Sequence, residues 1–490
     1  MLTVFLLLPV VGAAMIAFLP RAREHEAKWI ALAASGLAFA LSIVVFVRFD
    51  ADQAGYQMVD RFEWIRAGDA GFSVQYVLGV DGLSAPMVLL TGLLSLASVL
   101  VSFNVKLRTK EYFIWLLVLE TAVSGVFLSL DLIQFFLFWE LELLPMYLLI
   151  SVWGSGRKEY SAMKFLLYTI SGSALMLVGF LVLGLSAGTF DIAELTASAP
   201  TEAVLPLAVI FWFIMAAFLV KLPVFPVHTW LPDAHTDAPT AVSVMLAGVL
   251  LKMGGYGMLR IALPILPEQA HDFRVVLAAI AGFSVVYGAL ITIRQRDLKR
   301  LVAYSSVSHM GYVLLGVAAM GSVSMSGAAL QMFTHGTITG LLFIMVGLVY
   351  DRAHTRQISE LSGLMHHMPL IGVVMVVTGL AALGLPGLSG FVAEITVFLG
   401  SLSVHPAATI AAVFGVVLAA GYILWTVQRV FMGPPSERWA HLPDATEWWE
   451  RTAMAGMLLS IFVVGIYPRV LTDVIESGID PIAAIVQRGA

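Results

Sequence analysis

Apolar runs of about 20 residues recur along the whole chain, and they constrain its fold more than any other feature. An α-helix rises 1.5 Å per residue, so about 20 residues span the roughly 30 Å hydrocarbon core of a bilayer. Lipid offers no hydrogen bonds, so such runs must be helical. Of the 490 residues, 60% are hydrophobic and 12% are charged, whereas soluble domains are about 25% charged. The sequence therefore predicts an all-α polytopic membrane protein.

These runs predict about fourteen transmembrane helices. Their approximate bounds are 2–20, 29–48, 83–103, 112–130, 132–152, 163–187, 205–223, 240–262, 272–293, 300–320, 326–349, 368–400, 406–430 and 452–471. The first run precedes its basic residues, unlike a signal peptide, so we expect it to remain as the first span. The run 368–400 is too long for one straight span. Its central GLPGLSG motif predicts two half-helices or a strong tilt.

The distribution of positive charge predicts the orientation of these spans. Most of the 27 Lys and Arg residues fall in loops that follow odd-numbered spans. Cytoplasmic loops are enriched in Lys and Arg, so both termini are expected on the external, periplasmic side of a bacterial inner membrane. The polar segment 49–80 is then an external loop. The amphipathic, Trp-rich segment 431–451 is expected at the inner interface.

Two interrupted helices predict an internal repeat. Prolines break the chain between Leu222 and Pro239, and a second break follows about 160 residues later at Leu385–Gly390. Paired interrupted spans are typical of two inverted-topology repeats, each with a broken helix. The predicted domains are an N-terminal part with spans 1–3 and the external loop, a first repeat with spans 4–8, a second with spans 9–13, and an interfacial segment with the last span. Their bounds are 1–110, 111–265, 266–431 and 432–490.

Charged residues inside these apolar runs mark the predicted functional site. Each costs roughly 2.5–3.5 kcal/mol at the bilayer centre and must be paired, hydrated or neutralised. The candidates for proton transfer are Glu140, Lys221, Lys252 and Glu394. Lys221 can also be a snorkelling lysine at a helix end, and Glu140 can mark a helix end at an interface. Glu142 points about 200° away from Glu140 on a helix, so the two cannot face one partner.

Four histidines and one further lysine extend this set as candidate relay groups. His309 and His335 lie in apolar helices beside hydroxyl residues, and two on successive spans fit a proton relay better than isolated core histidines. His228 and His235 lie in the Pro-broken region, as relay groups or as loop polar contacts. Lys164 begins its span, so snorkelling is an equal alternative there.

Several chemistries are not expected in this chain. It has no cysteine, which excludes disulfides and thiolate ligation of zinc or iron–sulfur clusters. No Gly-rich loop follows a strand, so no NAD, FMN or ATP site is predicted. No His/Glu spacing indicates a metal, and the net charge of −5 gives no reason to expect nucleic acid binding.

The chain resembles the antiporter-like membrane subunits of respiratory complex I, which share ancestry with large subunits of multisubunit Na⁺/H⁺ antiporters. The resemblance covers essentially the whole chain and is strongest from 131 to 431. It is carried by FWELELLPMYLLI, VKLPVFPVHTWLPDAHTDAPT, LAGVLLKMGGYG, DLKRLVAYSSVSHMGY, YDRAHT and LPGLSGFVAEITVFLG. It implies that Glu140 pairs with Lys221, that Lys252 is the central relay, and that Glu394 passes protons onward. The glutamate at 394 and the lack of a long lateral helix favour one paralog of this family.

The resemblance also implies the wider setting. The chain is expected to act as a translocase subunit without a redox centre, while NAD, FMN, iron–sulfur clusters and quinone belong to other subunits. Expected partners are lipid, neighbouring antiporter-like subunits and a lateral helix from a longer paralog. The alternatives are a subunit of a multisubunit Na⁺/H⁺ antiporter and a subunit of a photosynthetic NDH-type complex, which the WELEL and YDRAHT motifs also resemble.

Overall fold

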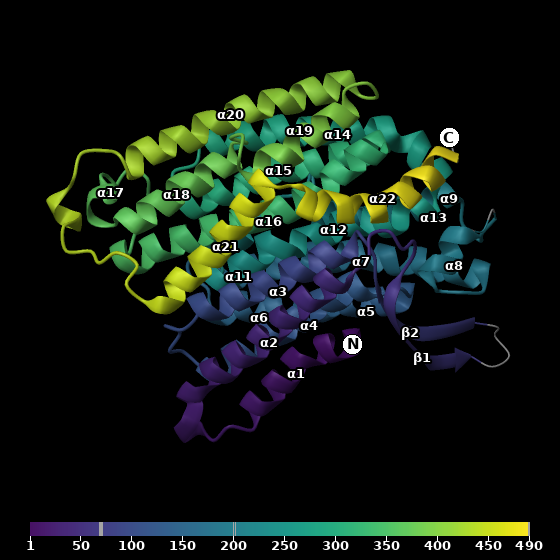
Figure 1. Cartoon of the computed structure of the whole chain (residues 1–490), viewed down its shortest axis with the longest axis horizontal. Helices are drawn as coiled ribbons and strands as arrows, with labels where there is room; N and C mark the ends of the chain where they lie inside the picture. Colours follow the sequence, from purple (N-terminus) through teal and green to yellow (C-terminus); the bar gives the residue numbers. More distant parts are fainter. Residues whose placement is uncertain (68–71, 199, 201, 489–490) are drawn as a thin grey trace.

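The apolar runs form a bundle of helices that lie side by side along one direction (Figure 1). The structure is a computed structural model that describes residues 1–67, 72–198, 200 and 202–488. Residues 68–71 of the predicted external loop and 489–490 of the last predicted domain lie outside the described residues. The all-α polytopic fold is confirmed, with one two-stranded hairpin added to it.

The elements follow the apolar runs closely. Those of the first half are α1 (Leu2–Ala17), α2 (Ala27–Arg48), β1 (Gln57–Ala67), β2 (Phe72–Val80), α3 (Ser84–Val101), α4 (Thr109–Leu128), α5 (Leu132–Leu141), α6 (Leu143–Trp153), α7 (Lys158–Ala187), α8 (Ile192–Ala197), α9 (Leu207–Lys221), α10 (Trp230–Asp237), α11 (Thr240–Met245), α12 (Leu251–Gly257) and α13 (Leu263–Ile265). Those of the second half are α14 (Pro267–Ile293), α15 (Leu298–Ala319), α16 (Ser322–Ala353), α17 (Leu364–His367), α18 (Pro369–Ala382), α19 (Ser389–Ser401), α20 (Pro406–Val430), α21 (Trp448–Ile466) and α22 (Arg469–Arg488).

The number of spans agrees with the prediction. Among the described residues, eleven helices are long and apolar enough to cross a membrane, and four shorter apolar helices accompany them. Two of those four, α18 and α19, are the halves of the predicted 368–400 span, separated by Leu383–Leu388. Counting them as one broken span makes fourteen. The predicted choice between half-helices and tilt is therefore decided in favour of half-helices.

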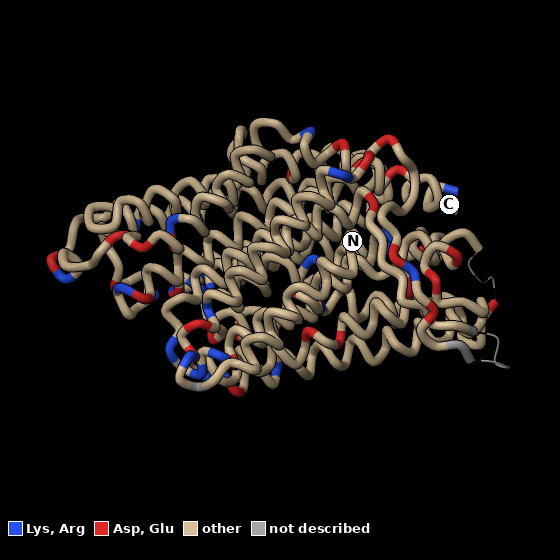
Figure 2. Tube along the Cα trace, turned by 60° about the horizontal axis from the view of Figure 1, so that its bottom comes forward, with Lys and Arg blue, Asp and Glu red and all other residues tan. Residues whose placement is uncertain are grey.

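The two ends of the bundle differ in charge and structure. The predicted loop 49–80 contains the antiparallel hairpin β1–β2, with Phe62 opposite Tyr76. The amino group of Met1 lies 3.2 Å from the carboxylate of Asp60 on β1. We call this the hairpin end, and the C-terminus also lies there (Figure 1). Most Lys and Arg residues gather at the opposite end, the basic end (Figure 2). Which end faces the cytoplasm stays a prediction.

The two broken helices enter the bundle from opposite ends, as inverted repeats require. Helix α9 starts at the hairpin end (Figure 1) and ends at Lys221, and a run of turns over residues 222–229 separates it from α10. Helix α18 starts at the basic end, and α19 continues towards the hairpin end. Both interruptions therefore expose backbone polar groups near mid-depth, where an irregular chain is tolerated only against protein or water.

The segment predicted as amphipathic, 431–451, is mostly irregular. It contains a single turn of 3₁₀-helix at Glu437–Trp439 before α21 begins. Its Trp439 and Leu442 are buried, and the guanidinium of Arg352 donates to the carbonyls of Pro443 and Asp444. The segment lies at the basic end, where positive loops gather.

A C-terminal amphipathic helix, α22, was not predicted. Its buried positions recur at helical spacing through Leu471, Ile475, Gly478, Ile479, Ile482, Ala483 and Val486. It crosses the bundle near the hairpin end over α16 and α13 (Figure 1). The crossing is closest at Gly478, where an added Cβ would lie within 3.0 Å of three backbone atoms of Gly82 and Leu83.

We predict that Gly478→Ala destabilises the protein by about 1–3 kcal/mol, because a methyl group forced into packed backbone costs that much. The measurement is the midpoint of thermal unfolding in detergent. Gly36→Ala is the matched control, since an added Cβ on Gly36 meets no atom within 4 Å and alanine favours helix. Equal midpoints for the two variants would contradict the close crossing.

Candidate functional site

Six buried ionisable side chains define the candidate site, and four of them lie on broken or irregular helices, whereas His309 and His335 lie on the uninterrupted helices α15 and α16. All six are less than 5% exposed: Glu142, Lys221, Lys252, His309, His335 and Glu394. Lys221 ends the half-helix α9, and Glu394 lies in the half-helix α19. Lys252 lies on α12 between two π-helical segments, Leu246–Leu250 and Met258–Ala262. Such π segments occur frequently at functional sites.

Lys221 pairs with Glu142, and this corrects the predicted pairing with Glu140. The ammonium group of Lys221 donates directly to Glu142 Oε1, and both side chains are buried. The ring of Trp139 lies 5.1 Å below the same ammonium group. Glu142 occupies the junction of α5 and α6. Pro145 has no N–H for the carbonyl of Leu141, so the helix kinks there.

Glu140 points elsewhere. It is half-buried, and its helical stripe contains Leu137 and Leu144, which are 42% and 52% exposed. One oxygen, Oε1, is buried and has no hydrogen-bond partner among the described residues. A spacing of two residues on a helix turns side chains about 200° apart. Burial of Glu142 therefore directs Glu140 towards the outer surface of the bundle, and its part in proton transfer stays a prediction.

Lys252 is fully buried on the wholly buried segment Thr240–Ile265. Its ammonium group donates to the carbonyl of Ala247, which the π-helical segment leaves accessible, and lies 2.7 Å from His335 Nδ1. A protonated lysine has donors only, so Nδ1 of His335 accepts while its proton is on Nε2. Lysine and histidine can then exchange a proton across this contact.

The contacts continue from His335 to Glu394. The rings of His335 and His309 have centroids 5.6 Å apart, and His309 Nδ1 lies 3.4 Å from Glu394 Oε1. These side chains line a cavity of about 10 Å³ together with Gln331 and Thr339. That is about the volume one water centre requires. The cavity therefore has room for a water between the two imidazole rings and the carboxylate.

The remaining predicted relay residues lie nearer the basic end. Lys164 forms an ion pair of 2.7 Å with Asp233 on α10. His235 is fully buried and stacks on Phe343 with ring centroids 4.6 Å apart. His228 packs edge-on against Tyr287 at 5.1 Å. Neither ring nitrogen of these two histidines has a hydrogen-bond partner among the described residues, so they are not part of the direct contacts around Lys252.

Several buried charged residues are absent from the predicted site, and Glu120, Arg260 and Asp81 are among them. Glu120 on α4 is 1% exposed, and neither carboxylate oxygen has a partner among the described residues. Its signal was a single acid in the apolar run LLVLETAVSG. Arg260 is 4% exposed and forms an ion pair with Asp81. No local pattern in the sequence relates these two positions, which are 179 residues apart.

Among the described residues, no group of three His, Asp or Glu side chains is placed to hold a metal ion. The site consists of carboxylates, ammonium groups and imidazoles that contact one another. Such groups can bind and release protons.

Comparisons with known proteins identify the family of this chain. The family model described as "NADH:quinone oxidoreductase/Mrp antiporter, TM" matches residues 129–419. NADH-quinone oxidoreductase subunit M of Rhodobacter capsulatus is 40% identical over 491 residues, which cover 97% of this chain and 94% of that protein. The chain belongs to the NADH:quinone oxidoreductase/Mrp antiporter family.

Other members of the NADH:quinone oxidoreductase/Mrp antiporter family agree. The NAD(P)H-quinone oxidoreductase chain 4 2 of Thermosynechococcus vestitus is 41% identical, over 96% of this chain and 90% of that one. A chain in the structure of respiratory complex I from Thermus thermophilus with bound NADH superposes with a TM-score of 0.90 at 28% identity, covering 99% of this chain and all of that one. A chain of the Mrp complex from Dietzia sp. has a TM-score of 0.84 at 21% identity, which shows the shared fold.

Proposed function

We propose that this chain is the M (chain 4) subunit of an NADH:quinone oxidoreductase and translocates protons along its row of buried charges. The names of its relatives, from subunit M to chain 4, support this placement. Quinone reduction then occurs in other subunits, which hold NAD, FMN, iron–sulfur clusters and quinone. The chain would lie in a bacterial inner membrane with its hairpin end outside, because the opposite end has the positive loops.

One observation carries the proposal. A series of neighbouring side chains runs from Lys252 through His335 and His309 to Glu394. Lys252 lies 2.7 Å from His335, the two imidazole centroids lie 5.6 Å apart, and His309 lies 3.4 Å from Glu394. In a region where a charge costs several kcal/mol, a row of touching titratable groups is typical of a proton relay. A spacer between subunits would be more stable with apolar residues at these positions.

The ion pair of Lys221 and Glu142 supplies the start of this route. Helix α12 packs tightly on α9, since an added Cβ on Gly254 would lie 2.5 Å from the carbonyl oxygen of Phe218. The close packing brings the backbone around Lys221 next to the turn that presents Lys252. A change in the ion pair therefore acts over a short range on the proton affinity of Lys252 through its charge.

Protons reach this row from the basic end. A cavity of about 660 Å³ opens there between α3, α11 and α16, and its lining includes Thr240, Lys299 and Asp351. Lys299 is buried and donates to the carbonyl of Ala238 at the start of α11. The cavity therefore extends polar surface towards the helix on which Lys252 lies.

The position of Glu140 indicates which surface of the chain faces a neighbouring subunit. Its exposed stripe with Leu137 and Leu144 leaves a half-buried carboxylate at the lateral surface. We place a neighbouring antiporter-like subunit against this stripe, where its own terminal charged residue can exchange protons with Glu140. A lateral helix from a longer paralog would run along the same assembly.

The complex that contains this chain, reconstituted in liposomes, tests the proposal. NADH and a quinone should generate a pH gradient without Na⁺, and Glu394→Gln should lower its initial rate on the order of a hundredfold, because a relay without one acid–base group loses that much. Glu268→Gln is the matched control. It makes the same change at an exposed carboxylate and should leave the rate unchanged.

The second candidate, a Na⁺/H⁺ antiporter subunit, is favoured by the shared fold with the Mrp chain. It requires a pH gradient that follows an imposed Na⁺ gradient without NADH. That result, together with a normal rate for Glu394→Gln, would overturn the assignment to NADH:quinone oxidoreductase.

A further inference from the structure

A second buried charge cluster lies on the same helix as Lys252. Tyr256 and Arg260 follow Lys252 at intervals of four residues, so the three lie on one face of the segment Thr240–Ile265. Eight residues correspond to about 12 Å of rise towards the hairpin end. Arg260 thus lies between the central lysine and that face of the membrane. The relay described above does not use it.

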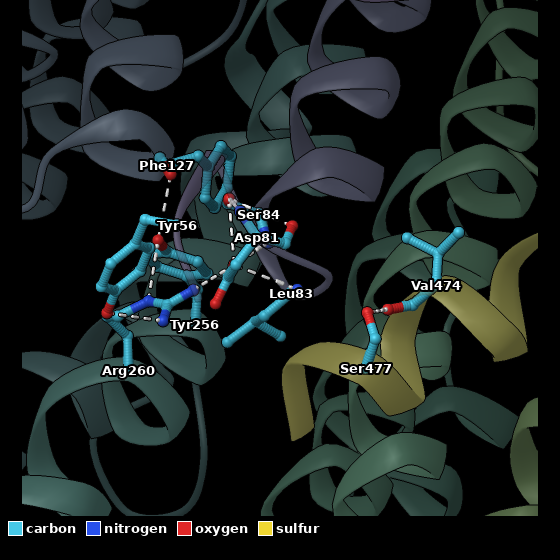
Figure 3. Close-up of polar contacts among 9 residues, drawn as sticks. All are labelled: Tyr56, Asp81, Leu83, Ser84, Phe127, Tyr256, Arg260, Val474 and Ser477. Carbon is cyan, nitrogen blue, oxygen red and sulfur yellow. Dashed lines mark hydrogen bonds and ion pairs between the residues drawn. The ribbon is translucent and has the colours of Figure 1, made fainter. Parts of the chain in front are cut away.

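Every nitrogen of the Arg260 guanidinium has a partner (Figure 3). Nε donates to the hydroxyl of Tyr256 at 3.2 Å, Nη1 donates to the hydroxyl of Tyr56 at 3.2 Å, and Nη2 donates to Asp81 Oδ1. The hydroxyl of Tyr256 in turn donates to the carbonyl of Phe127 on α4 at 3.0 Å. The two tyrosine rings flank the guanidinium at 5.3 and 5.4 Å.

The carboxylate of Asp81 is balanced by a second source of positive charge. Its Oδ1 also accepts hydrogen bonds from the backbone N–H groups of Leu83 and Ser84, at 3.1 and 3.0 Å, at the start of α3. The N-terminus of a helix carries about half a positive charge. The negative charge of Asp81 is therefore shared between the start of α3 and Arg260. Helix α22 packs beside it, against Gly82.

We propose that Arg260 is the barrier that separates Lys252 from the hairpin face, so that protons leave Lys252 sideways to Glu394. An arginine does not release its proton in a protein, and a fixed cation repels protons that approach it. The hydrogen bonds that its three nitrogens donate keep the guanidinium between Lys252 and the hairpin end. This inference rests on the proposed function for the direction of transport. The barrier itself concerns only passive proton movement.

The test measures passive leak in the reconstituted complex without NADH. A pH gradient is imposed across the liposomes and its decay is followed with a pH-sensitive dye. Arg260→Gln should speed the decay on the order of tenfold, the effect of removing one unit charge about 10 Å away at an effective dielectric constant of about 20. Arg260→Lys should decay like the wild type, because a lysine beside Asp81 stays charged. Arg48→Gln, exposed at the same end, is the control.

The conservative variant separates a barrier from a structural contact. Both Gln and Lys lose the three-way hydrogen bonding of Arg260, so a purely structural role predicts equal leak in both. Equal leak, or no leak in Arg260→Gln, overturns the proposal. If Arg260→Gln does not assemble, Asp81→Asn decides the question. It leaves the cation in place, so unchanged decay supports a charge barrier and faster decay overturns it.

Combining variants distinguishes failure of this inference from failure of the proposed function. Adding Lys252→Met to Arg260→Gln should return the leak to the wild-type rate, since the leak is expected to pass through Lys252. A double variant that leaks as fast as Arg260→Gln overturns the barrier at Lys252 but leaves the relay assignment intact. Normal pumping by Lys252→Met alone overturns the relay assignment, whatever the leak.

Discussion

Lys252→Met in the intact complex is expected to assemble and to lose proton pumping on the order of a hundredfold. Methionine fills the volume of the lysine stem but holds no proton, so the contact with His335 at 2.7 Å no longer carries an exchangeable one. Packing is expected to survive, because replacing a buried charge by an apolar residue of similar shape is often neutral for stability. The measurement is the initial rate of pH-gradient formation in proteoliposomes, divided by the quinone reduction rate.

Two further variants define what is lost. Lys252→Arg should fail as well, because arginine retains its proton. Lys28→Met is the matched control: this lysine is half-buried at the basic end beside Phe103, apart from the relay, and its loss should leave the ratio unchanged. A Lys252→Met complex that pumps normally would show that the contact from Lys252 to Glu394 does not conduct protons.

The ion pair of Lys221 with Glu142 is expected to give a large coupling energy in a double-mutant cycle. Glu142→Leu alone leaves a buried ammonium group without its anion, which costs about 3–5 kcal/mol. Removing Lys221 as well, as Lys221→Met, should restore most of that stability, because no charge then remains unpaired. The cycle of single and double variants, followed by thermal unfolding of the subunit in detergent, should yield a coupling of about 3 kcal/mol, the upper end of the range for residues in contact.

The same cycle with Glu140 is the control. Glu140 is half-buried on the outer stripe. The coupling energy between Glu140→Leu and Lys221→Met should therefore be near zero. Proton pumping should still fall in Glu140→Gln, if the neighbouring subunit delivers protons there. A strong coupling of Lys221 to Glu140 and a weak one to Glu142 would reverse the assignment of the pair.

The predictable part of this molecule came from features that are local in sequence. Apolar runs of membrane length predict helices because lipid leaves the backbone no other partner, and the fourteen spans agree with the helices found. The GLPGLSG motif predicts the break between α18 and α19 because proline and glycine act on their immediate neighbours. Lys252 and Glu394 were identified for a similar reason: a charge within an apolar run must have a use or a partner.

Contacts between distant segments were beyond the reach of the sequence. The helix is interrupted at the single residue Glu142, and this kink decided that Glu142 rather than Glu140 meets Lys221. Local periodicity could not predict which way the broken helix turns. The amphipathic α22 was missed because its length and apolar pattern resemble neither a span nor a loop. The charge of Arg260 was visible, but its burial was not.

By itself, the sequence determined that this chain has about fourteen apolar runs of membrane length, that two of its helices are interrupted, and that Lys252 and Glu394 are charges within apolar runs. Those properties follow from hydrophobicity and from the geometry of single residues. The tertiary structure alone decided which charges touch: Lys221 with Glu142, Lys252 with His335, and Arg260 with Asp81. These pairs depend on how helices far apart in the chain rotate and pack.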